Sequence, residues 1–171
     1  MAIILQAFTT PANTQVVADT AAPPGSLPTP AVPTSPAMIS PLIDGSSAYI
    51  WSPNNAPNQT VTFQSIFSIG TLPLVTVALP ISVYYAFAAN ETATVTATLE
   101  IVNLLGIVVA TIPLFSGSSS DPQNVDISQA DTLIGLSLLG NSGRIVVNAK
   151  VTAAASPGRY LGQITVRDFV L

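Results

Sequence analysis

Side chains that perform acid–base or nucleophilic chemistry are scarce in this sequence. The chain has no His and no Cys, which removes the usual general base near neutral pH and every thiolate function. Glu91 and Glu100 are its only glutamates. A carboxylate pair that hydrolyses glycosides needs a separation of roughly 5–9 Å, whereas nine residues of one extended strand span about 30 Å. We therefore assign no catalytic residue and expect a protein that is not an enzyme.

Three aspartates at five-residue spacing, Asp121, Asp126 and Asp131, are the residues that most resemble a metal site. With Asn124 and backbone carbonyls they would offer oxygen ligands to Ca²⁺. The spacing lacks the alternating ligands and the glycine of an EF-hand loop. A solvated polar loop over residues 116–131 explains the aspartates better, so we predict no metal and no cofactor.

Five aromatic residues would suit the stacking of a sugar ring: Trp51, Tyr49, Tyr84, Tyr85 and Tyr160. Aromatic residues make up only 6 % of the chain, and large aromatic side chains more often fill cores or anchor interfaces. A carbohydrate-binding β-sandwich module is therefore kept as an alternative function.

The charge content excludes several classes of partner. Charged residues are 7 % of the chain, hydrophobic residues 49 %, and the net charge is −4. A surface that neutralises phosphates needs many basic side chains, so we expect no nucleic acid partner. The apolar run over residues 99–115 is broken by polar residues and a proline, so we expect no membrane insertion. A monomer with so few charges is poorly protected from association. This favours an assembly in which much of its surface is buried against copies of the same chain.

Period-two patterns predict an all-β fold. The clearest run covers residues 92–101, where threonines alternate with apolar residues. Further strands are expected over residues 48–51, 60–69, 72–77, 81–87, 107–114, 144–153 and 160–170. Residues 133–139 fit a strand or one helical turn. About eight short strands with turn signals between them predict an antiparallel β-sandwich, of the jelly-roll type, over residues 46–171.

The first 45 residues are read as an extended, proline-rich N-terminal arm. Eight of the 15 prolines lie here, and proline disfavours helices and central strands. The arm strap consists of Pro23, Pro24, Pro28, Pro30, Pro33 and Pro36. In polyproline-II geometry residues 21–41 would span roughly 60 Å.

The tip of the arm is apolar, which a free tail does not need. We predict that residues 2–8 dock on another subunit as an added strand. The docking residues would be Ala2, Ile3, Ile4, Leu5, Ala7 and Phe8. The tip is short and has no basic flank, so it does not fit a signal peptide.

The arm, the low-charge β-domain and the closing strand over residues 162–171 together resemble subunits of bacterial endospore appendages. The domain also resembles the apolar β-domains of exosporium proteins. This resemblance implies a jelly roll whose N-terminal connector docks on preceding subunits of a fibre. The chain departs from that family because it lacks the cysteines that cross-link the connector.

These observations predict a structural subunit that forms a homopolymer with copies of itself. The expected assembly is an extracellular or surface filament, built through the N-terminal arm, at the exterior of a cell, spore or particle. A viral capsid or decoration protein is the closest alternative, although the arm contains no basic residue. The carbohydrate-binding module is the third reading.

Overall fold

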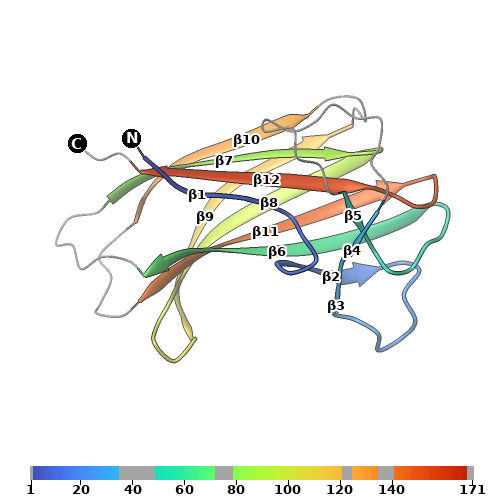
Figure 1. Ribbon diagram of the computed structural model, residues 1–171, viewed down its shortest axis with the longest axis horizontal. Helices are drawn as coiled ribbons and strands as arrows, with labels where there is room; N and C mark the ends of the chain where they lie inside the picture. Colours follow the sequence, from blue (N-terminus) through green and yellow to red (C-terminus); the bar gives the residue numbers. More distant parts are fainter. Residues whose placement is uncertain (1, 35–48, 72–78, 121–124, 135–140, 169–171) are drawn as a thin grey trace.

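The computed structural model describes residues 2–34, 49–71, 79–120, 125–134 and 141–168. Within these residues the chain is an antiparallel β-sandwich of two six-stranded sheets, drawn as upper and lower layers in Figure 1. The described residues contain no helix, and therefore none that is long and apolar enough to cross a membrane. The predicted all-β sandwich is confirmed. The strand predicted over residues 72–77 and the segment after residue 134 lie outside the described residues.

The strands of each sheet come from distant parts of the sequence. The first sheet contains β1 (Ile3–Phe8), β4 (Val32–Pro33), β5 (Ile50–Trp51), β7 (Leu79–Ala89), β10 (Asp126–Ile134) and β12 (Tyr160–Asp168). The second contains β2 (Thr14–Asp19), β3 (Thr29–Pro30), β6 (Gln59–Thr71), β8 (Thr92–Val102), β9 (Val108–Ser119) and β11 (Ser142–Ala153). Their spatial orders are β10-β7-β12 with β1, β5 and β4 beyond β12, and β3-β2-β6-β11-β8-β9. The long strands pass back and forth between the layers in the order of a jelly roll.

Strand alternation explains why the central strands hold together. In β8 the threonines face solvent, while Val95 and Leu99 are fully buried. Strand β11 lies between β6 and β8 and pairs with both along its length. Its residues Ile145, Val147 and Val151 are at most 1 % exposed. Each fully buried aliphatic side chain of this size contributes about 1.5–3 kcal/mol to folding.

Aromatic rings join the two sheets in the core. The Phe63 ring lies 5.3 Å from the Tyr160 ring and 5.7 Å from the Trp51 ring, centroid to centroid. The hydroxyls of Tyr85 and Tyr160 are 2.5 Å apart and fully buried. Burial raises the pKa of both phenols, because ionisation would place a charge in an apolar interior. The pair satisfies two polar groups that would otherwise be costly to bury.

The prediction of a polar loop over residues 116–131 is wrong at both ends of this range. Strand β9 continues to Ser119, and β10 begins at Asp126 and pairs with β7 along its whole length. Strand β10 does not show the usual alternation of large apolar and polar residues, because small residues face the interior. Ser128 is buried opposite Gly117, where an added Cβ would lie 2.1 Å from the Ser128 hydroxyl. Ile127, by contrast, faces solvent.

The structure also differs from the predicted division at residue 45. Strands β1 to β4 pair with strands of the same chain, so the described residues 2–34 belong to the two sheets. The proline strap does not extend away from the domain, because the chain turns back after β2 and β3 pairs with β2. Its prolines 23, 24, 28, 30 and 33 are exposed, and Pro36 lies outside the described residues.

A hydrogen-bond network anchors this N-terminal region. The Asp19 carboxylate at the end of β2 accepts bonds from the Ser52 hydroxyl (2.5 Å), the Gln59 amide (2.7 Å), the Ala21 N–H (2.7 Å) and the Asn54 amide (3.2 Å). Burial raises the pKa of Asp19, but these four bonds outweigh it and hold the pKa below the ordinary value of 3.8. The carboxylate therefore ties β2 to the loop between β5 and β6.

Candidate functional site

The hairpin that joins β8 to β9 presents its apolar tip to solvent. The turn is closed by the Asn103 side chain, which accepts hydrogen bonds from the N–H groups of Leu105 (2.9 Å) and Ile107 (3.0 Å). Gly106 has φ of 78°, which favours glycine. Leu104 and Leu105 project from this turn and are 80 % and 81 % exposed. A turn with two exposed leucines is typical of a contact surface, because such side chains gain free energy when they leave water.

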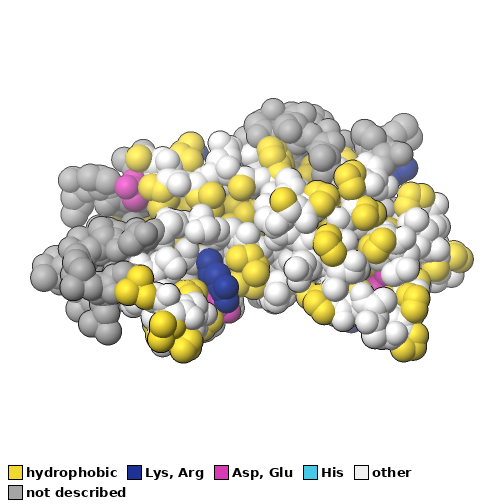
Figure 2. Space-filling view, turned by 60° about the horizontal axis from the view of Figure 1, so that its bottom comes forward, with side chains coloured by type: hydrophobic (Ala, Val, Ile, Leu, Met, Phe, Trp, Pro, Cys, Tyr) yellow, Lys and Arg dark blue, Asp and Glu magenta, His cyan; other side chains and the backbone are white. Residues whose placement is uncertain are grey.

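Strand β9 continues this apolar surface along the free edge of the second sheet. Ile107, Val108 and Val109 are also among its exposed apolar residues. No charged residue occurs between Glu100 and Asp121. Edge strands of soluble monomers usually carry charges that prevent pairing with other sheets. Strand β9 has no charge, and its interruptions are Pro113 and two register shifts in its pairing with β8. Charged side chains are also sparse on the face shown in Figure 2. We call residues 104–109 together with β9 the hairpin edge.

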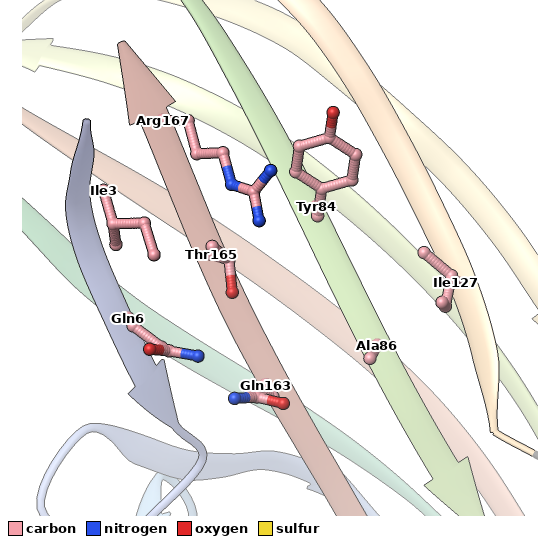
Figure 3. Close-up of a pocket in the computed structure, with 8 residues that line it drawn as sticks. All are labelled: Ile3, Gln6, Tyr84, Ala86, Ile127, Gln163, Thr165 and Arg167. Carbon is pink, nitrogen blue, oxygen red and sulfur yellow. The ribbon is translucent and has the colours of Figure 1, made fainter. Parts of the chain in front are cut away.

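A second feature is a groove of about 200 Å³ on the outer face of the first sheet. Four neighbouring strands contribute to it: Ile3 and Gln6 from β1, Gln163, Thr165 and Arg167 from β12, Tyr84 and Ala86 from β7, and Ile127 from β10. Figure 3 shows these side chains on the same side of the sheet. Strand alternation places the residues of β7 and β12 there, because residues of the same parity face the same side. In β1 a register shift between Ile3 and Leu5 lets Ile3 and Gln6 line the same groove.

Among the described residues that line the groove, Arg167 is the one that carries a charge. Its guanidinium carbon lies 5.4 Å from the centre of the Tyr84 ring, in cation–π geometry. Its Nε atom is buried and has no hydrogen-bond partner among the described residues. The ion pair that the structure records within these residues joins Arg144 and Glu100 at 2.7 Å. The part of the groove lining that the structure describes therefore has a cation and no carboxylate.

The predicted aromatic platform does not exist as an exposed surface. Trp51, Tyr49, Tyr85 and Tyr160 are at most 1 % exposed, because Tyr85 and Tyr160 face the core and Trp51 donates to the Gln59 side chain. These four residues cannot stack on a sugar. Tyr84 alone of the five is reachable, at the wall of the groove.

The predicted acidic sites are dispersed. Glu100 pairs with Arg144 across β8 and β11. Asp126 and Asp131 lie at different positions of β10, and Asp131 accepts a bond from the Ser82 hydroxyl. Asp121 and Asn124 lie outside the described residues. No group of acidic residues in the described segments is arranged to hold a metal.

The predicted docking segment has a partner within its own domain. Residues 3–8 pair with β12, and the Ala2 N–H donates to the Asp168 carboxylate at 2.8 Å. Leu5 and Ala7 pack against the core, whereas Ile3 and Ile4 are about half exposed. Docking of this segment on another subunit stays a prediction.

Neither functional feature was predicted as a site. The hairpin edge had a signal in the sequence, since a 20-residue stretch free of charge is visible there. For the groove the sequence contained only a weak signal, which is the alternation of Gln163, Thr165 and Arg167 along one strand. Its other walls come from strands that are distant in the sequence.

Comparisons with known proteins give distant likenesses in fold. No protein-family model matches the chain. No curated protein matches it either. The solved structure of the infectious bursal disease virus Gx strain is similar with a TM-score of 0.41 and 11% identity, over 80% of this chain and 36% of that one. The tailspike protein 4 enzymatically active domain of bacteriophage CBA120 gives a TM-score of 0.44 and 11% identity, over 94% and 20%.

A CBM4 structure gives a TM-score of 0.36 and 10% identity, over 78% of this chain and 89% of that one. The chain thus spans about a third or less of the two viral chains. All these likenesses are too distant to carry information on function.

Proposed function

We propose that this chain is a structural subunit that assembles with copies of itself, and that copies meet at the hairpin edge. The observation that carries the proposal is the free, uncharged edge of the second sheet with its exposed apolar tip. A sheet edge offers unpaired N–H and C=O groups to another chain. The low charge of the whole chain supports the same role, because little electrostatic repulsion opposes contact between copies.

The energy available at the hairpin edge fits an assembly of many weak contacts. Fully burying one aliphatic side chain is worth about 1.5–3 kcal/mol. Scaled by their exposures of 38–81 %, the five exposed side chains at residues 104, 105 and 107–109 offer about 5–9 kcal/mol. Association costs about 4–15 kcal/mol in lost freedom and ordering. One such contact is therefore marginal, and a lattice of repeated contacts would be stable.

A filament on the exterior of a cell, spore or particle is the form of assembly that we propose. Contacts between different surfaces of two copies build open helices when the rotation does not close. The hairpin edge supplies one surface, and the side of β1 at which Ile4 is exposed is an edge of the other sheet. A closed shell would result if the same contacts closed on themselves.

Electron microscopy and light scattering of the purified full-length protein test this function. We expect concentration-dependent particles of high mass from the natural sequence and a smaller species from Val109→Lys. Val17→Lys on β2 is the matched control, because Val17 is also an exposed valine on a strand. Uniform filaments support the proposal in full, and closed shells would replace the filament by a capsid-like role. A monodisperse monomer at all concentrations overturns self-assembly.

A further inference from the structure

The outer-face groove has the composition of a binding site that is separate from the hairpin edge. The groove lies on the first sheet, whereas the hairpin edge belongs to the second. Its volume of about 200 Å³ is below the range of roughly 300–1,000 Å³ that holds drug-sized ligands. The groove therefore suits one ring or a similarly small group.

Arg167 sets the charge of the ligand. Its guanidinium carbon lies 5.4 Å from the centre of the Tyr84 ring, and Figure 3 shows the two side chains beside each other in the groove. Asp131 lies two strands away in the same register row, and no ion pair joins it to Arg167 among the described residues. A guanidinium is planar and matches a carboxylate with two parallel hydrogen bonds. The ligand is therefore expected to carry a carboxylate.

The rest of the lining indicates what surrounds that carboxylate. Gln6 and Thr165 are register partners on β1 and β12, and both are neutral groups that can donate and accept hydrogen bonds. Ile3 and Ile127 are apolar groups at opposite ends of the groove, three strands apart, so a single ring contacts one of them (Figure 3). Neutral hydrogen-bonding groups together with an apolar residue suit a ring that has both hydroxyls and C–H faces. An inorganic phosphate would accept hydrogen bonds from the arginine and from the neutral polar groups, but it would make no use of the apolar residues.

From this combination we infer that the groove binds the uronate unit of an acidic saccharide. The carboxylate lies on Arg167, the hydroxyls lie on Gln6 and Thr165, and the ring lies against Ile3. The groove holds a single sugar residue, because its volume of about 200 Å³ has room for about one ring. The site would attach an assembled surface to an acidic polysaccharide.

Titration of the full-length protein with D-glucuronate, followed by calorimetry or NMR, tests the site. D-glucose, which lacks the carboxylate, and acetate, which lacks the ring, are the matched ligands. We expect glucuronate to bind and both controls to bind about tenfold or more weakly. A uronate polymer compared with the free sugar distinguishes a polysaccharide ligand from a monosaccharide.

Substitutions of groove residues test whether glucuronate binds in the groove. Arg167→Gln is expected to weaken glucuronate binding about 10- to 100-fold, the usual effect of losing hydrogen bonds to a charged group. Gln6→Ala, at an exposed edge position, is expected to weaken it less and keeps the test valid if Arg167→Gln does not fold. Arg144→Gln, which lies outside the groove, serves as the control.

Three results would overturn the inference. These are no glucuronate binding, acetate binding as tight as that of glucuronate, or equal losses in Arg144→Gln and Arg167→Gln. The second result would replace the sugar acid by a simple carboxylate such as a peptide end.

Discussion

Replacing Asp19 by Asn removes the charge that anchors the N-terminal strands to the domain. The carboxylate accepts four hydrogen bonds in the native structure, from Ser52, Gln59, Ala21 and Asn54. An amide keeps the shape but directs its own N–H groups at some of these donors. Hydrogen bonds to a charged group each contribute about 1.5–3 kcal/mol, but their sum overstates the effect because Asp19 is partly exposed to solvent. We expect a loss of about 2 kcal/mol.

For a chain of 171 residues, that loss lowers the melting temperature by about 4–8 °C. Differential scanning calorimetry at neutral pH measures it directly. Fluorescence of Trp51, the one tryptophan of the chain, gives an independent reading, because its indole N–H donates to Gln59, which in turn donates to Asp19. The control is Asp126→Asn, since Asp126 has no side-chain hydrogen bond among the described residues, and we expect it to change stability little.

The effect of Asp19 should also depend on pH. Its pKa in the folded state is below 3.8, so its stabilisation is complete above the unfolded pKa and is lost as the pH falls through the folded value. The difference between the natural protein and Asp19→Asn should be constant from neutral pH to about pH 5 and should shrink below about pH 4. An equal difference at neutral pH and at about pH 2.5, or none at neutral pH, would refute the anchoring role.

Three core substitutions give further predictions. Tyr85→Phe leaves the Tyr160 hydroxyl buried without its partner and should cost about 1–3 kcal/mol in urea unfolding, whereas the double change to Phe should recover most of that loss; strictly additive losses would contradict this. Gly158→Ala places a Cβ 2.3 Å from the Trp51 ring and should cost about 3 kcal/mol with a changed tryptophan emission. Gly162→Ala places a Cβ 1.9 Å from the Tyr85 hydroxyl and should cost a similar amount by thermal melting, while a neutral result at either glycine would show that the sheet yields there.

The parts of the fold that sequence could predict are those that follow local periodicity. Strand β8 alternates over most of its length and β11 alternates apart from the buried run Ile145 to Val147, and both were predicted to within two residues of their bounds. Strand β10 was missed because its interior positions carry Ser128 and Ala130, while Ile127 points outward. Its pattern follows from the close approach of Gly117 on the other sheet, which no local signal reveals.

Long-range contacts explain the remaining differences. Proline was expected to disfavour helices and central strands, and Pro30 and Pro33 lie in two-residue strands at the ends of the sheets. Nothing near Asp19 in the sequence shows that Ser52 and Gln59 will donate hydrogen bonds to its carboxylate. The predicted arm is therefore held to the sandwich by partners more than 30 positions away. The groove is similar, because Tyr84 and Arg167 meet only when β7 and β12 pair. Candidate sites made by several strands become visible only once the register is known.

The pairing of β1 with β12 has a consequence for the order in which the molecule can be completed. Ala2 and Asp168, which close this pair, are separated by 166 positions, so a chain emerging from the ribosome displays its first strand long before the acceptor strand exists. Closing so large a loop is slow because of its entropy. During that interval, a β12 of a neighbouring chain competes for the same strand. Crowded synthesis would thus favour exchanged, linked chains, and dilute refolding would favour closed monomers.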